Sequence, residues 1–312
     1  MLRTAFFSAL LIFSHTVFAE PFAYVSNAKS GSVSIIDTQT DEVVAEIKAA
    51  KKPRGAAISR DGKTLYVSDQ PNNSIAKVDL IKREVVGTIK LGESPEGVSA
   101  SPDGLWIIAA SEVSNAVNFV SVRTGKKSFA IKTQGKNPEH AVFSPDSKLV
   151  FVSAEEADTV DVLDVATRKE VASIKVGERP RGMAFTSDGK LIYVASEIAS
   201  TVYAIDVASR KVIAEIKAGN FSNGVTMAPD NSKVYVSNGK DGSVSVIDTT
   251  SHQVIATIPV GKRPWNMGIT ADGKKLYVAN GKSNSVSVID TVSLKVVKEI
   301  TVGEDPWGVV IK

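Results

Sequence analysis

The sequence predicts an all-β protein, a seven-bladed β-propeller built from four-stranded antiparallel blades. Three observations lead to this fold class: a repeat of about 42 residues, strand-type alternation within each repeat, and two chain ends that each carry part of one repeat. Repeats of this length that hold four strands are typical of propeller blades, which a ring arrangement leaves with few exposed sheet edges.

The repeat is marked by three landmarks, each recurring every 42 or 43 residues. The first is the opening residue of a P-x-G motif, at Pro53, Pro95, Pro138, Pro180, Ser222, Pro264 and Pro306. The second is a large apolar residue, at Tyr24, Tyr66, Ile108, Phe151, Tyr193, Tyr235 and Tyr277. The third ends a "VID"-type phrase, at Asp37, Asp79, Asp164, Asp206, Asp248 and Asp290, with Ser121 as the exception.

Within one repeat the apolar residues alternate with a period of two. The unit that begins at Gly182 reads "GMAFT", the turn "SDG", "LIYVAS", a loop, "TVYAIDV", the turn "ASRK" and "VIAEIKA". Alternating β-branched residues between turn residues predict four antiparallel strands. The aspartates of both turn types are expected to bond turn backbone groups rather than Ca²⁺, because no D-x-D-x-D spacing follows them.

The two ends complete each other. The chain stops at "DPWGVVIK", a first strand without successors, while "FAYVSN" near the start is a second strand without a predecessor. Joined in one blade, they add a seventh to the six whole units and close the ring. A solenoid would instead need a cap at each end.

The N-terminus predicts a signal peptide over residues 1–19. Arg3 precedes an apolar run from Ala5 to Phe13, and Val17 and Ala19 stand at the small-residue positions before a cleavage site. We expect cleavage after Ala19 and a single propeller domain over residues 20–312. The expected location is the periplasm, with an extracellular one also open.

Composition excludes several function classes. A formal net charge of +3 is too small to indicate nucleic acid or an acidic membrane as the main partner. There is no cysteine, so neither a disulfide nor a C-x-x-C-H haem attachment is expected. His140 has one companion histidine in the mature chain, His252, on the opposite face, so we expect no transition-metal centre.

Several blade phrases carry a family resemblance. "YVSN", "LYVAN", "SVIDT" and "VGxxPxG" resemble the YVTN family of bacterial propellers over the whole mature chain. "SEIASTVYAIDVASRKV" and "LYVANGKSNSVSVIDTVSLKVVKEITVGEDPWGV" are more narrowly similar to small exported propellers associated with PQQ-dependent alcohol catabolism. This resemblance implies an association with quinoprotein dehydrogenases and supplies no catalytic residue.

The expected binding site is the rim of the P-x-G face, where the variable residues around the motif gather. The rim has an aromatic arc and several charged groups, as ligand sites often do. We assign no catalytic residue and no metal ligand. The predicted rim residues are Arg54, Glu96, Glu139, His140, Arg181, Phe221, Asn223, Arg263, Trp265, Asn266 and Trp307.

His140 and Asn266 stand where other repeats have glycine, at the narrowest part of the ring. His140 is therefore expected to fill space there, a metal or proton-transfer role being the alternative. No intrinsic cofactor is expected. PQQ is a candidate ligand, because Arg54, Arg181 and Arg263 with the tryptophans could accommodate a planar tricarboxylate.

Three functions remain open on the sequence. The leading hypothesis is an exported, non-catalytic, monomeric propeller that binds a protein or small molecule, such as a quinoprotein dehydrogenase or its cytochrome. The alternatives are a propeller enzyme or cofactor handler, lactonase-like or haem-d1-binding, and a cell-surface adhesion protein. A lactonase reading would draw on Glu96, Glu139, His140 and Arg181.

Overall fold

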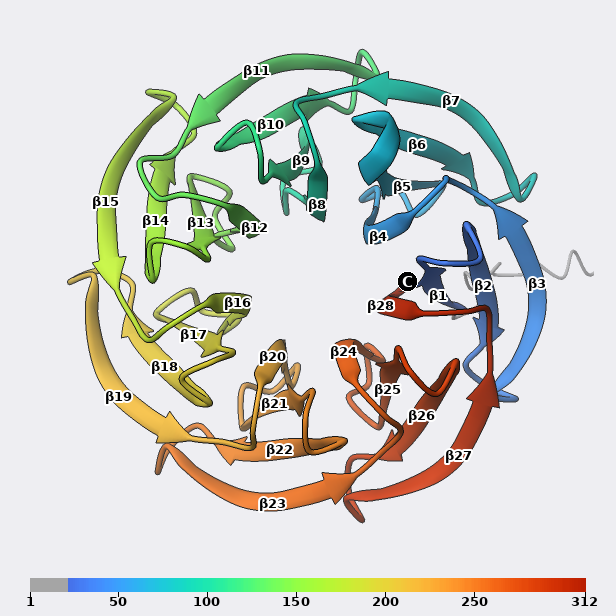
Figure 1. Ribbon diagram of the computed structural model, residues 1–312, viewed down its shortest axis with the longest axis vertical. Helices are drawn as coiled ribbons and strands as arrows, with labels where there is room; N and C mark the ends of the chain where they lie inside the picture. The colour runs from blue at the N-terminus through green and yellow to red at the C-terminus, as the bar shows by residue number, and fades with distance from the viewer. Residues whose placement is uncertain (1–21) are drawn as a thin grey trace, which may run out of the picture.

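The computed structural model describes residues 22–312, and these form a ring of seven four-stranded antiparallel sheets (Figure 1). The predicted fold class is confirmed. The predicted signal peptide and its cleavage site lie outside the described residues. Within residues 22–312, no helix is long and apolar enough to cross a membrane.

Each blade runs from an innermost strand at the axis to an outermost strand at the circumference. The innermost strands are β4 (Pro53–Ile58), β8 (Pro95–Ala100), β12 (Pro138–Phe143), β16 (Pro180–Phe185), β20 (Ser222–Met227), β24 (Pro264–Ile269) and β28 (Pro306–Ile311). The second strands are β5 (Thr64–Asp69), β9 (Trp106–Ser111), β13 (Leu149–Ala154), β17 (Leu191–Ser196), β21 (Lys233–Asn238), β25 (Lys275–Asn280) and β1 (Phe22–Asn27). The third strands are β6 (Ser74–Asp79), β10 (Ala116–Ser121), β14 (Thr159–Asp164), β18 (Thr201–Asp206), β22 (Ser243–Asp248), β26 (Ser285–Asp290) and β2 (Ser32–Asp37). The outermost strands are β7 (Glu84–Lys90), β11 (Lys126–Lys132), β15 (Lys169–Lys175), β19 (Lys211–Lys217), β23 (Gln253–Pro259), β27 (Lys295–Thr301) and β3 (Glu42–Lys48). The first strand of each list belongs to blade 1, the second to blade 2, and so on, so that blade 1 contains β4 to β7 and blade 7 contains β28, β1, β2 and β3. A 3₁₀ turn, η1 (Gln70–Asn72), follows β5.

Blade 7 contains both ends of the described chain. Its strand order is β28-β1-β2-β3, and Val310 pairs with Tyr24 across the junction. The Lys312 amide also donates to the Phe22 carbonyl. The ring is therefore closed by hydrogen bonds between the first and last strands, as the split repeat predicted.

The core lies between neighbouring blades. Side chains of the second and third strands are almost completely buried, and the large apolar residue of each second strand packs against the next blade. Tyr277 of blade 6, for example, packs with Ala23, Val25 and Ile36 of blade 7. Its hydroxyl donates to Asp41, whose other carboxylate oxygen accepts from Lys275 at 2.7 Å.

The repeated aspartates act in turns, as predicted. Asp61, Asp188 and Asp272 each accept a hydrogen bond from the amide two residues later, next to a glycine with positive φ. The aspartates that end the third strands bond the amides of the following turn, and Ser121 replaces them by accepting from the Thr124 amide.

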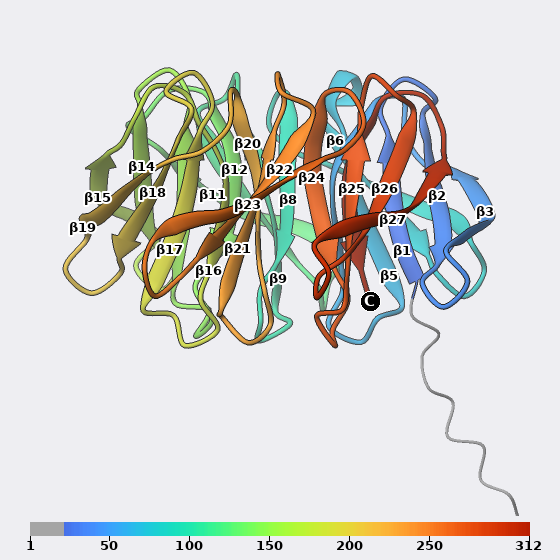
Figure 2. The ribbon, with the colours of Figure 1, turned by 90° about the horizontal axis from the view of Figure 1, so that it is seen from below.

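Because strand direction alternates, all P-x-G loops and all loops between second and third strands emerge on one side of the ring. Figure 2 shows the two loop sides edge on. We call this side the P-x-G face; the Asp-containing turns and Lys312 lie on the other side.

Candidate functional site

The P-x-G motif begins each innermost strand with a break in strand pairing. In blade 1 the register shifts between Pro53 and Ala56, which frees Arg54 and Gly55 from regular pairing. A Cβ on Gly97 would meet the Glu139 carbonyl at 2.8 Å, so the glycine lets neighbouring blades approach at the axis. The residue between proline and glycine is thereby held at the mouth of the ring.

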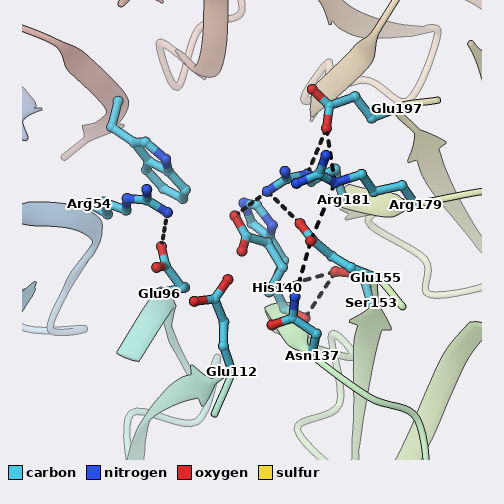
Figure 3. A network of polar contacts seen from close by, with 12 residues as sticks. Arg54, Glu96, Glu112, Asn137, His140, Ser153, Glu155, Arg179, Arg181 and Glu197 are labelled. Atoms are coloured by element: carbon cyan, nitrogen blue, oxygen red, sulfur yellow. Dashed lines mark hydrogen bonds and ion pairs between the residues drawn. The ribbon is translucent and has the colours of Figure 1, made fainter. Parts of the chain in front are cut away.

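The centre of the site is a buried hub around Arg181 (Figure 3). Its Nη1 lies 2.6 Å from Glu139 Oε1 and 2.5 Å from Glu155 Oε1, and its Nε lies 3.1 Å from Glu197 Oε2. Glu197 in turn accepts from Arg263 Nη2 at 2.7 Å and lies 3.4 Å from Arg179 Nε. All the members except Arg179 and Arg263 are buried, so the charges neutralise one another away from solvent.

A second group, centred on Glu96, lies beside this hub. Arg54 Nη1 donates to Glu96 Oε2 at 2.6 Å, and Gln70 donates its amide to the other oxygen of Glu96. Glu112 accepts from Ser94 at 2.8 Å. One oxygen from each of Glu96, Glu112 and Glu139 lies within 4.8 Å of the others, and these three form the one group of possible metal ligands found among residues 22–312.

The surroundings of these three carboxylates favour a bound proton over a metal ion. Lys52 donates to the Gln70 carbonyl oxygen at 2.7 Å, which turns the Gln70 amide hydrogens towards the carboxylates. An amide donor repels a cation, and Ca²⁺ takes six to eight oxygen ligands. A shared proton relieves the repulsion instead.

The carboxyl pKa values separate accordingly. Burial, with repulsion from Glu139, raises the pKa of Glu96 to about 9, against the opposing effect of Arg54. Burial and Glu139 also raise the pKa of Glu112 above its usual range, and that of Glu155 to about 7. Burial alone would raise the pKa of Glu139 as well, but several neighbouring groups, Arg181 foremost, together outweigh it and the pKa falls to about 2. Glu139 is thus the ionised member of the group.

His140 closes the axis. Its ring stacks on Trp307 from across the ring, with centroids 5.4 Å apart and planes 11° from parallel. Burial lowers the pKa of His140 to about 4, so the ring is neutral at pH 7. Neither ring nitrogen makes a hydrogen bond of good geometry to residues 22–312. The space-filling role of His140 stays a prediction.

Trp265 and Phe221 lie further out and enclose Arg263. The Arg263 guanidinium lies 4.2 Å from the Trp265 ring centroid and 5.5 Å from that of Phe221. Trp307, by contrast, is buried, so the exposed part of the predicted aromatic arc consists of Phe221 and Trp265. Asn223 is also buried, and Asn266 donates to the Trp307 carbonyl at 3.3 Å.

The structure therefore divides the predicted rim residues. Those that are partly exposed are Arg54, His140, Phe221, Arg263, Trp265 and Asn266, while Glu96, Glu139, Arg181, Asn223 and Trp307 are buried. Arg54 already donates to Glu96, and Arg181 is paired with three carboxylates, so binding PQQ through them would require breaking these contacts. That the rim residues bind a ligand stays a prediction.

Sequence reasoning missed Glu112, Glu155 and Glu197. These occupy one repeat position, directly after the second strand, where the other blades have Ala28, Gln70, Gly239 and Gly281. Three consecutive blades have glutamate at this repeat position, whereas the other four blades have a small or amide residue. This departure from the repeat is visible in the sequence. The prediction followed the P-x-G loops and left out the second set of loops on the same face.

Comparisons with known proteins agree with the fold. A family model described as "Lactonase, 7-bladed beta-propeller" matches residues 126–295, and a "YNCE-like beta-propeller" model matches residues 18–104. No curated protein matches the sequence.

Solved structures with similar folds come from proteins of different kinds. One is hydrazine synthase of Kuenenia stuttgartiensis, 25% identical with a TM-score of 0.79, covering 86% of this chain and 92% of that one. A functionally unknown protein from Desulfotomaculum acetoxidans DSM 771 is 18% identical, with a TM-score of 0.83 over 93% of this chain and 98% of that one. NirN, the dihydro-heme d1 dehydrogenase in complex with DHE, is 17% identical, with a TM-score of 0.71 over 92% of this chain and 74% of that one.

Proposed function

The chain belongs to the seven-bladed β-propeller family whose model is described as lactonase, and from this premise we propose that it is a binding protein. Its partner docks on the P-x-G face, and no reaction takes place there. Membership of a fold family leaves the activity open, because unrelated functions share one propeller architecture.

The observation that carries this proposal is the closed state of the mouth. Arg181 is bound by three carboxylates and Glu197 by three guanidinium groups. The neutral His140 ring is covered by Trp307. A catalytic group must reach its substrate, and a general base must be free to take a proton. Here the buried charges hold the blades together, and the groups free to meet a partner are the outer loops.

We further propose that the protein is exported to the periplasm and serves a PQQ-dependent alcohol oxidation system. The N-terminal signal pattern and the blade-level resemblance support these two points. A quinoprotein dehydrogenase or its cytochrome is then the expected partner, with PQQ itself as the small-molecule alternative. The carboxylates of PQQ would be bound more readily by exposed lysines beside Arg263 than by Arg54 and Arg181, which already have partners. These lysines are Lys240, Lys262 and Lys282.

Native mass spectrometry at low ionic strength tests the proposal, on protein purified gently from its own source together with an absorption spectrum. The expected result is an added protein mass that disappears in an Arg263→Glu, Trp265→Ala variant. An Arg60→Glu variant on the opposite face serves as the control. A bare chain, even after mild cross-linking, would contradict the binding function.

Lactone hydrolysis is the second candidate, and one observation favours it. Glu155, whose pKa burial raises to about 7, lies in a surface pocket of about 390 Å³ with Asn137, Arg179 and Glu178. A carboxylate that titrates near neutral pH suits a general base. Hydrolysis of a δ-lactone that is lost in Glu155→Gln and kept in Glu156→Gln would establish this activity and overturn the binding-only proposal.

A further inference from the structure

The loops of the P-x-G face carry opposite charges on the two halves of the ring. The half over blades 2–4, drawn green to yellow in Figure 1, spans the loops between residues 91 and 200. These loops contain seven acidic residues and two basic ones. The acidic residues are Glu93, Glu112, Glu155, Glu156, Asp158, Glu178 and Glu197, and the basic ones are Lys136 and Arg179. We call this half the acidic arc.

The loops over blades 5, 6, 7 and 1 show the reverse. They contain seven basic residues, Lys29, Lys51, Lys52, Lys240, Lys262, Arg263 and Lys282, and three acidic ones, Asp241, Glu304 and Asp305. We call this half the basic arc. Since the whole chain has a formal net charge of only +3, the separation is a property of this face rather than of the protein's total charge.

Six exposed residues of the two arcs carry charges that no ion pair neutralises in the described part of the chain. Glu93, Glu156 and Glu178 are exposed on the acidic arc, and Lys240, Lys262 and Lys282 on the basic arc. Within residues 22–312 none of these six makes an ion pair of 4.0 Å or less. Other members of the arcs are paired at the surface: Lys29 lies 3.0 Å from Glu304, and Asp158 lies 3.4 Å from Lys175. The remaining salt bridges of the face lie deeper, around Arg181 and Arg54.

Each arc also has shallow pockets with apolar surface. On the basic arc, Phe221, Lys240, Lys262, Arg263 and Lys282 line a pocket of about 420 Å³. On the acidic arc, Val113 is 64% exposed and Ile198 45% exposed, each in a loop beside the glutamates. Charges spread over the loops of seven blades cannot converge on one small ligand, but they suit a protein surface that covers the whole face.

We infer that the P-x-G face is a dipolar docking surface for a protein with the opposite pattern. An acidic patch of the partner covers the basic arc, and a basic patch covers the acidic arc. This rests on the proposed binding function and adds the partner's charge pattern and its single orientation. Complementary charge steers association and excludes other orientations, and its effect weakens as salt is added.

Two fluorescein-labelled octapeptides, one of glutamate and one of lysine, are the probes, measured by fluorescence anisotropy at 20 and 150 mM NaCl. The basic-arc variant is K240E/K262E/K282E, and the acidic-arc variant is E93K/E156K/E178K. The control for the basic-arc variant, K148E/K190E/K274E, makes the same change of net charge as that variant but on the opposite face, where these lysines are exposed.

The glutamate peptide is expected to bind at least about fivefold more weakly to the basic-arc variant than to wild type, and as tightly as wild type to the control. The lysine peptide is expected to lose the same factor only on the acidic-arc variant. Equal losses on the control, or no binding at 20 mM NaCl, would overturn the inference.

Two further outcomes separate this inference from the function it rests on. A salt-sensitive dimer of the chain in sedimentation equilibrium would show that a second copy of this chain binds the P-x-G face. It would overturn the inference that the partner is a different protein. A native partner mass that both arc variants retain would refute the dipolar surface while leaving binding at the face intact.

Discussion

Removing the Arg181 side chain is expected to expose how the propeller mouth is held together. In Arg181→Ala, Glu155 keeps Arg179 at 3.4 Å, and Glu197 keeps Arg263 at 2.7 Å. Glu139 has no other ion-pair partner in residues 22–312 and is 1% exposed. The variant therefore contains one uncompensated buried charge rather than three. We expect its free energy of unfolding to be lower than that of wild type by about 3–5 kcal/mol at pH 7.

Urea denaturation of the purified protein measures this loss. The matched control is Arg60→Ala, because Arg60 is exposed and makes a single hydrogen bond to the Asp103 carbonyl. Its expected loss is below about 0.5 kcal/mol. Arg181→Lys keeps the charge but not the planar fork that reaches three carboxylates, so an intermediate loss is expected.

The loss should depend on pH in a defined direction. In wild type, burial raises the pKa of Glu139, but Arg181, the strongest of several opposing groups, helps to hold it at about 2. Without Arg181, burial raises this pKa above the unfolded value of about 4.5, so the variant is penalised least below pH 4.5 and increasingly as pH rises. Adding Glu139→Gln should recover at least half of the loss at pH 7. A loss below about 1 kcal/mol, or no recovery in the double variant, would refute the reasoning.

Four further expectations follow from other parts of the ring. His140→Gly, which restores the residue of most repeats, should cost about 2–4 kcal/mol in urea denaturation and shift tryptophan emission to the red, because Trp307 loses the ring stacked on it. His140→Phe should cost less than about half as much, since the native ring is neutral at pH 7; equal losses would show that a polar role of His140 matters. The pKa of Glu96 is raised to about 9, so its contribution to stability is complete below the unfolded value and lost as pH rises to about 9. Between pH 5 and 9 the melting temperature of Glu96→Gln should therefore fall less than that of wild type, and a parallel decline would contradict the raised pKa. Deleting residues 306–312 removes β28, the innermost strand of blade 7, and should abolish cooperative unfolding in calorimetry. Retention of a single sharp transition would show that the ring does not need this strand.

The fold could be predicted from the sequence because each blade repeats the same local rules. Turn residues, period-two alternation and the large buried apolar residue of the second strand recur at fixed spacing, so one correctly interpreted repeat gives the other six. The complementary ends, "FAYVSN" and "DPWGVVIK", identify the closing blade from the sequence alone. Local pattern and global architecture agree throughout the ring.

The site was less predictable because it depends on departures from the repeat that meet in space. Arg181 contacts Glu139 from the preceding P-x-G motif, and this pair was within reach of sequence reasoning. Glu155 and Glu197 come from another loop set, and nothing local says that they turn towards the same guanidinium. The stacking of His140 on Trp307, 167 positions apart and on opposite blades, requires the width of the closed ring.

The pairing of β28 with β1 also constrains when this protein can fold. The strand β1, made early in synthesis, lacks its inner neighbour until β28 has left the ribosome. Until then blade 7 has three strands. The inner edge of β1 lacks its hydrogen-bonding partner, and the apolar side chains that β28 covers in blades 6 and 7 are exposed to water. Joining two segments almost the whole chain apart is also the entropically most expensive contact in the ring. Completion of the propeller is therefore a late, single event, and a chain interrupted anywhere before residue 306 is an open sheet array prone to pairing with its neighbours.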